Sequence, residues 1–180
     1  MSDIRSRKLL LAAIFISIFQ FSIFNFLACE NITCPLNNTV AGVYGFYASA
    51  RSGNGPFVAG GAIKISDTLT ITALGVDSVV ANKLVNRSSV SLPVSFYGEI
   101  DSLRFTFTSS DGSTGADTIW MTKENFGHLD DPSCPLHMWH NITGVRSTHH
   151  LIDSVLVNHA EINYDGLENL QIYFRTQAED

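Results

Sequence analysis

Apolar residues recur at every second position through most of this chain, and no other feature limits its fold as strongly. Neighbouring side chains of a β-strand point to opposite faces of a sheet, so this spacing places one apolar row on one side. In the clearest run, Leu103, Phe105 and Phe107 alternate with Arg104 and Thr106. Beyond residue 40 we find no convincing helical spacing of three or four. The pattern predicts an all-β fold, an antiparallel β-sandwich of immunoglobulin-like type.

Alternating runs bounded by turn-forming residues mark the predicted strands. They cover 40–48, 63–66, 68–73, 90–92, 103–108, 118–122, 136–145, 152–157, 162–164 and 170–174. The strands 103–108 and 118–122 are expected to pair as a hairpin. The segments 52–61 and 125–135 are expected to be loops, because Gly and Pro are concentrated in the first and no clear alternation continues in the second.

An Asp followed by Ser or Thr and then by an aliphatic residue occurs at Asp67, Asp77, Asp101, Asp117 and Asp153. An Asp side chain in a turn accepts hydrogen bonds from nearby backbone N–H groups, so each is predicted to lie just before a strand. Calcium binding is the alternative, but the separations between these residues fit no single calcium-binding loop.

The first 28 residues have the features of an export signal, with three basic residues followed by the apolar run 9–19. A second apolar segment ends at Ala28 and Cys29, which resembles a bacterial lipobox. We therefore expect a signal peptide at 1–28, a covalent lipid on Cys29, and attachment to the outer membrane of a bacterial cell envelope, on a face left open. Two alternatives are a cleaved secretory signal without lipid and an uncleaved anchor, since 9–28 is long enough to span a bilayer.

The remaining chain is expected to form a lipid-anchored tether at 29–38 and a single β-sandwich domain at 39–180, because no Pro- or Ser-rich linker divides it. Three basic residues and one acidic residue lie in the leader, so the rest holds 8 basic and 16 acidic residues, a formal charge of −8. This acidic balance argues against nucleic acid and against an anionic membrane surface as the main ligand. Membrane attachment would come from the lipid.

The chain has three cysteines. If Cys29 is acylated, Cys34 and Cys134 remain to pair in an oxidising compartment, and we predict that disulfide. Two unrelated buried thiols are the alternative.

Five of the six histidines lie between His128 and His150. On strands, His137 and His140 would point to opposite faces, and so would His149 and His150, so neither pair forms a ready chelate. We expect no metal and no cofactor besides the lipid, and we expect these four histidines to lie on the surface or in loops. They are the candidate ligands if cross-strand partners complete a site. The neighbouring carboxylates at 130 and 131 are interpreted as a solvated turn, and no catalytic residue is predicted.

Several short segments together resemble a family of small Bacteroidetes lipoproteins classed as a domain of unknown function. They are Cys34–Val40, Asp67–Thr70, Ser91–Ser95, Asp131 with Cys134, Ile142–Val145, Ile152–Val155 and Ile172–Phe174. The resemblance covers the whole chain after the leader. It implies an acylated Cys29, the Cys34–Cys134 pair and an all-β domain, and it implies no activity. The glycine-rich segment 52–61 is longer than is usual in that family.

The sequence therefore favours a non-catalytic envelope lipoprotein that binds an envelope protein or glycan through a strand edge or a loop. Candidate contact residues are Tyr44, Phe46, Tyr47, Phe57 and Trp139, most of which are also expected in the core. The alternative function is a metal-dependent or hydrolytic enzyme that uses the region 125–150.

Overall fold

The computed structural model describes residue 34 and residues 39–51 and 55–175. The chain divides into two compact units, Met1–Cys34 and Pro35–Asp180, and the second contains all the strands described below. The signal peptide, Cys29 and most of the tether lie outside the described residues.

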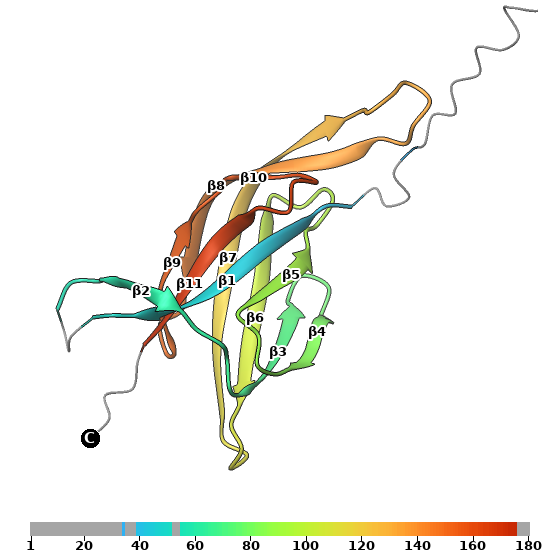
Figure 1. Cartoon of the computed structure of the whole chain (residues 1–180). Coiled ribbons are helices and arrows are strands. Elements are labelled where there is room, and N and C mark those ends of the chain that lie inside the picture. Colours follow the sequence, from blue (N-terminus) through green and yellow to red (C-terminus); the bar gives the residue numbers. More distant parts are fainter. Residues whose placement is uncertain (1–33, 35–38, 52–54, 176–180) are drawn as a thin grey trace, which may run out of the picture. The chain divides into compact units, whose positions relative to one another are not determined.

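In the described part of the chain, eleven strands and no helix form two sheets (Figure 1). The strands are β1 (Ala41–Ser49), β2 (Ala59–Ala62), β3 (Thr68–Ala73), β4 (Ser78–Leu84), β5 (Ser89–Pro93), β6 (Ile100–Thr108), β7 (Thr114–His128), β8 (His137–Ser147), β9 (Ile152–Val157), β10 (Glu161–Ile162) and β11 (Glu168–Arg175). The predicted all-β sandwich is confirmed.

The first sheet has the strand order β2-β1-β11-β9, and β5 also pairs with β1. The second sheet has the order β10-β8-β7-β6-β3-β4. The pairing of β1 with β11 is parallel, and the other strand pairs are antiparallel. The predicted hairpin of β6 with β7 is present. Ile100 pairs with Thr122 at its open end, and Thr108 pairs with Thr114 next to the turn.

The core lies between the two sheets and is built from the alternating apolar rows. Tyr44 and Phe46 of β1 are fully buried and face Phe105 of β6 and Phe174 of β11 in tilted and edge-to-face ring contacts. Such ring pairs add to the stabilisation that comes from apolar burial alone. Two of the five candidate contact residues, Tyr44 and Phe46, are therefore core residues.

Four sequence predictions about strand limits are wrong. The segment 63–66 makes only an isolated bridge, from Ile65 to Arg87. Part of the predicted loop 52–61 belongs to β2, where Gly60 lies so close to β1 that a Cβ atom would be 2.4 Å from the Ala48 carbonyl oxygen. The strand β7 continues to His128, which shortens the predicted loop 125–135. Three of the five marked aspartates, at 101, 117 and 153, lie inside strands, and only those at 67 and 77 directly precede one.

Candidate functional site

The four candidate histidines do not converge. His137 and His140 are both buried, on opposite faces of β8, whereas His149 and His150 are exposed in the loop between β8 and β9. Within the described residues, no three His, Cys, Asp or Glu side chains are placed to hold a metal ion. The expectation that these histidines lie on the surface or in loops is wrong for His137 and His140.

His137 lies in a row of polar groups near the end of the β7–β8 hairpin. Its Nδ1 is hydrogen-bonded to the Tyr164 hydroxyl, and its Nε2 lies 3.3 Å from Oδ2 of Asp130. The other oxygen of Asp130 lies 3.3 Å from Nε2 of His128. Burial, and then the charge of Asp130, raise the pKa of Tyr164 above its ordinary value. A raised pKa makes the phenolate harder to form, which is the reverse of what activates a nucleophile.

His140 lies inside the sandwich beside a buried lysine. The Lys123 ammonium donates hydrogen bonds to the carbonyl oxygens of Ser95, at 2.8 Å, and Gly98, and to Oδ1 of Asn125 at 2.6 Å. Burial and the nearby Lys123 charge lower the pKa of His140 to about 4, so its ring is neutral at pH 7. Burial also lowers the pKa of Lys123. This cluster fixes the loop before β6 against β7 and β8.

Two carboxylates that the sequence placed in turns are instead buried and fully engaged. Asp117 accepts hydrogen bonds from the loop between β8 and β9, including the backbone N–H groups of Leu151 at 2.6 Å and Ile152 at 2.8 Å. Asp153 accepts from Ser49 Oγ at 2.6 Å and from Arg51 Nε at 3.1 Å. All five aspartates share the same local sequence pattern, so the sequence did not separate these two from the turn residues Asp67 and Asp77.

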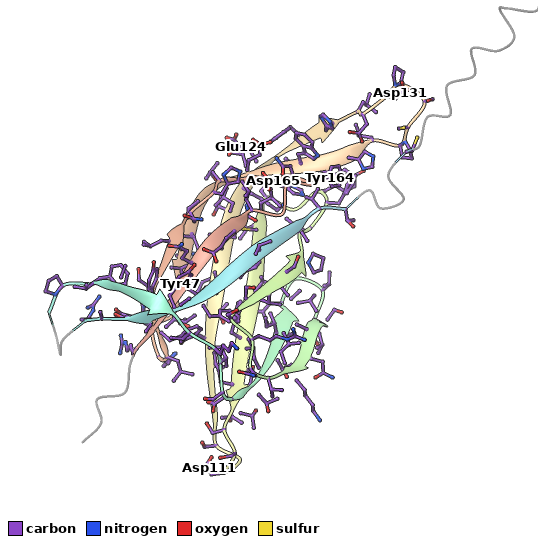
Figure 2. The ribbon with its side chains drawn as sticks, in the orientation of Figure 1. Tyr47, Asp111, Glu124, Asp131, Tyr164 and Asp165 are labelled. Carbon is purple, nitrogen blue, oxygen red and sulfur yellow. The ribbon has the colours of Figure 1, made fainter. Side chains whose placement is uncertain are left out.

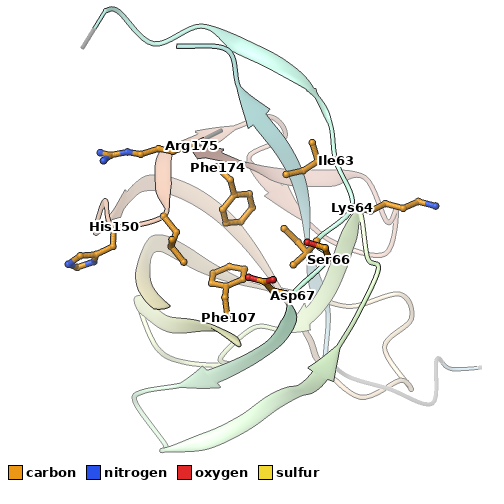
Figure 3. Close-up of a pocket in the computed structure, with 10 residues that line it drawn as sticks. Ile63, Lys64, Ser66, Asp67, Phe107, His150, Phe174 and Arg175 are labelled. Carbon is orange, nitrogen blue, oxygen red and sulfur yellow. The ribbon is translucent and has the colours of Figure 1, made fainter. Parts of the chain in front are cut away.

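A pocket of about 510 Å³ opens at one end of the sandwich, between the two sheets. Its floor is apolar: the rings of Phe107 and Phe174 meet edge to face with centroids 5.4 Å apart, and Ile63 and Leu151 lie beside them. We call it the end pocket. Figure 3 shows the two phenylalanine rings facing each other in its centre.

The rim of the end pocket is polar. It is formed by Lys64, Ser66, Asp67, His150 and Arg175. In Figure 3 the side chains of Lys64, His150 and Arg175 point away from the centre, toward solvent. Asp67 accepts a hydrogen bond from Ser109 Oγ at 2.9 Å, so its carboxylate is already partly engaged. The sequence alone does not indicate this pocket, because the pocket joins segments that are far apart in the chain.

A second, smaller hollow of about 370 Å³ lies beside the turn between β3 and β4. Val76 and Ile100 are exposed on its wall, and Val80 and Leu103 line it further in. It has few side-chain polar groups in its lining, so it offers little to orient a ligand.

The remaining predicted contact residues lie on the outer side of the first sheet or on the second. Tyr47 donates a hydrogen bond to Glu168 at 2.9 Å and lies beside the ring of Tyr173, against which Phe57 packs edge to face. Trp139 is half-buried under the His128 ring, which stacks on it with centroids 3.7 Å apart. The His128 ring therefore covers one face of the Trp139 ring, so that face is closed to a planar or sugar ligand.

Cys34 and Cys134, the cysteines expected to pair, are disulfide-bonded. The third cysteine of the chain is Cys29. A bond from Cys34 to Cys29 would leave no cysteine for Cys134, and a bond from Cys134 to Cys29 would leave none for Cys34. Cys34 and Cys134 are therefore bonded to each other. In the ranges that the structure describes, no helix is long and apolar enough to cross a membrane.

Comparison with known proteins places the chain in a family. No curated protein and no solved structure is significantly similar to this chain. Residues 68–174 match a family of unknown function, DUF6452, which covers β3 to nearly the end of β11 and leaves β1 and Cys34 outside. The match agrees with the expected membership of a family without assigned activity, although it is shorter than the resemblance suggested. The chain therefore belongs to the DUF6452 family, a family of unknown function.

Proposed function

We propose that this protein is a non-catalytic lipoprotein of the bacterial cell envelope, anchored to the outer membrane through Cys29, and that its sandwich binds an envelope protein. The basic and then apolar leader that ends at Ala28 and Cys29 supports the anchor. The end pocket supports the binding role.

The composition of the end pocket is the observation that carries the proposal. An apolar floor with a polar rim suits an apolar side chain inserted from a partner, with the rim orienting the surrounding backbone. Phe107 and Phe174 are 5% and 8% exposed, so they offer ring edges at the bottom of a hole and no open faces. A glycan needs open aromatic faces and many hydrogen-bond partners, so we favour a protein segment as the ligand.

A site-specific photo-crosslinker tests the binding role. Placed at Lys64 or at Arg175 of the full-length protein in its envelope, it should give an adduct of one defined mass. The matched control is Lys83 in β4, also a lysine position but outside the pocket lining. Adducts equal at position 83 and at the pocket positions would refute the assignment, and adducts of graded mass that a glycosidase removes would indicate a glycan instead.

The anchor is tested separately by the mass of the mature protein. An acylated Cys29 at the N-terminus is expected, and Cys29→Ser should release the protein from the membrane fraction. A free N-terminus beyond Cys29 would reject the lipoprotein while leaving the end pocket to be tested as above.

A further inference from the structure

Apolar side chains gather at the free end of the β7–β8 hairpin. Phe126 is 42%, Leu129 53%, Leu136 45% and Tyr164 44% exposed, and half-buried Trp139 contacts the rings of Phe126 and Tyr164. We call these five residues the hairpin-end patch. In Figure 2, Asp131 marks the tip of this hairpin and Tyr164 lies beside its strands.

The patch is held in place by ring contacts and by one close approach. The rings of Phe126 and Tyr164 both meet Trp139 edge to face, at centroid distances of 6.4 and 6.3 Å. Leu136 lies over Gly127, where an added Cβ atom would be 2.9 Å from its side chain. Phe126 and Trp139 are paired on one face of the hairpin, and Gly127 points to the other, so Leu136 lies on the face opposite to the rings. The patch therefore surrounds the end of a paired hairpin, and exposed apolar groups of this kind mark an interaction site.

The charges around the patch argue against negatively charged occupants. Asp130 and Asp131 lie in the loop at the hairpin end and Glu124 lies on β7 nearby, whereas the described strands carry no Lys or Arg between positions 124 and 145. A surface of this kind is not attracted to acidic proteins or to anionic lipid headgroups. Aromatic rings with apolar neighbours and no net positive charge suit the interface of a zwitterionic bilayer, where Trp and Tyr are enriched.

The disulfide connects this hairpin to the proposed anchor. Cys134 lies in the loop between β7 and β8 and is bonded to Cys34, which follows Cys29 by five residues. Five residues of fully extended chain span at most about 17 Å. An acyl chain on Cys29 would thus enter the bilayer within about 17 Å of Cys34. The disulfide joins Cys34 to Cys134, which lies in the loop beside the patch.

We propose that the hairpin-end patch contacts the lipid surface and lies in the interfacial layer of the membrane that holds the anchor. This inference rests on the proposed acylation of Cys29. The patch then orients the domain on the membrane, which a single point of attachment would not do.

The two tryptophans of the chain provide the test. Trp120→Phe leaves Trp139 in the patch, and Trp139→Phe leaves Trp120 in the middle of β7, where the Arg146 guanidinium lies 4.0 Å above its ring. Trp120 precedes Phe126 by six residues, about 20 Å along the strand. The acylated full-length variants are incorporated into phosphatidylcholine vesicles that contain lipids brominated near the headgroup, and fluorescence quenching is measured.

We expect quenching of Trp139 to exceed that of Trp120 by about twofold or more, because bromine quenches only at close range and Trp is drawn to the interface. Leu129→Gln in the Trp120→Phe background should reduce the quenching of Trp139, and this comparison does not depend on the folding of the Trp139→Phe variant. Equal quenching of both tryptophans in protein that floats with the vesicles would overturn the inference and leave the anchor intact. Protein that does not float and has no acyl mass would overturn both.

Discussion

Asp117 gives the sharpest prediction about what holds this sandwich together. Its carboxylate is 1% exposed and accepts hydrogen bonds from Thr148 Oγ1 and the His150 backbone N–H on one oxygen, and from the Leu151 and Ile152 N–H groups on the other. It therefore ties β7 of one sheet to the loop that leads into β9 of the other.

The variant Asp117→Asn keeps the volume and removes one acceptor. Its best orientation keeps the amide oxygen toward the N–H groups of Leu151 and Ile152 and turns the NH₂ group toward the Thr148 hydroxyl, which can accept a hydrogen bond, and the His150 N–H, which cannot. The His150 N–H then loses its acceptor, at about 1–3 kcal/mol, so the unfolding free energy should fall by about 1–3 kcal/mol. With a urea m-value of about 2 kcal/mol/M, the midpoint drops by about 0.5–1.5 M.

The assay is urea unfolding followed by tryptophan fluorescence, with Asp111→Asn as the matched control. Asp111 is exposed in the turn after β6 and accepts from Ser113, a bond that the Asn oxygen retains, so its midpoint should not move. Equal midpoints for the two variants would refute the reasoning. If Asp117→Asn does not fold, Thr148→Val, which removes one of the bonds, should lower the stability by about 1–2 kcal/mol.

The same group predicts a pH dependence. Burial raises the pKa of Asp117, but the hydrogen bonds from Thr148 and from the loop backbone outweigh burial and hold the pKa below its ordinary value. A carboxyl with a lowered folded-state pKa stabilises the fold above its unfolded pKa, near about 3.9, and this stability is lost as the pH falls through the folded value. The loss of stability on acidification below about pH 4 should therefore be smaller in Asp117→Asn than in the wild type.

Three further predictions concern other parts of the chain. Burial lowers the pKa of Lys123 below the unfolded value of about 10.4, so the unfolding free energy should rise with pH between the two values, and Lys123→Met should lose that rise in urea titrations. Reduction of the Cys34–Cys134 disulfide should lower the unfolding free energy by about 4–5 kcal/mol, and an unchanged urea midpoint with reductant would contradict this. Gly45→Ala would place its Cβ 1.9 Å from a Glu168 carboxylate oxygen and should cost about 1–3 kcal/mol, whereas Gly144→Ala, with nothing within 4 Å, should leave the melting temperature unchanged.

The sequence predicted the strands that obey simple alternation and missed what depends on pairing. Leu69 and Ile71 of β3, and Leu103 and Phe105 of β6, point to the core as their spacing predicts. Residues 63–66 have the same local pattern, yet only Ile65 finds a bridge partner. Alternation reports which face a side chain takes, but a strand exists only where a neighbour supplies backbone hydrogen bonds.

The aspartates show the same limit at the level of single side chains. The sequence context of Asp117 and Asp153 is the one that places Asp67 and Asp77 in turns, so local chemistry could not tell the two groups apart. Asp117 is buried because the loop between β8 and β9, from another part of the chain, brings N–H donors to its carboxylate. The end pocket was unpredictable for the same reason, because its floor joins Phe107 of one sheet with Phe174 of the other.

The two proposed surfaces, the end pocket and the hairpin-end patch, lie toward opposite ends of β7. This separation suits a domain that contacts lipid at one end and a protein at the other. Gly115, which pairs with the pocket residue Phe107, lies near the start of β7, and His128 ends β7 beside the hairpin-end patch. The 13 residue steps from Gly115 to His128 span about 44 Å at about 3.4 Å per residue. If the patch lies in the lipid interface, the end pocket opens far outside it, where a protein partner can reach it without contacting the bilayer. A paired antiparallel hairpin is well suited to hold that distance, which a single lipid attachment would not fix.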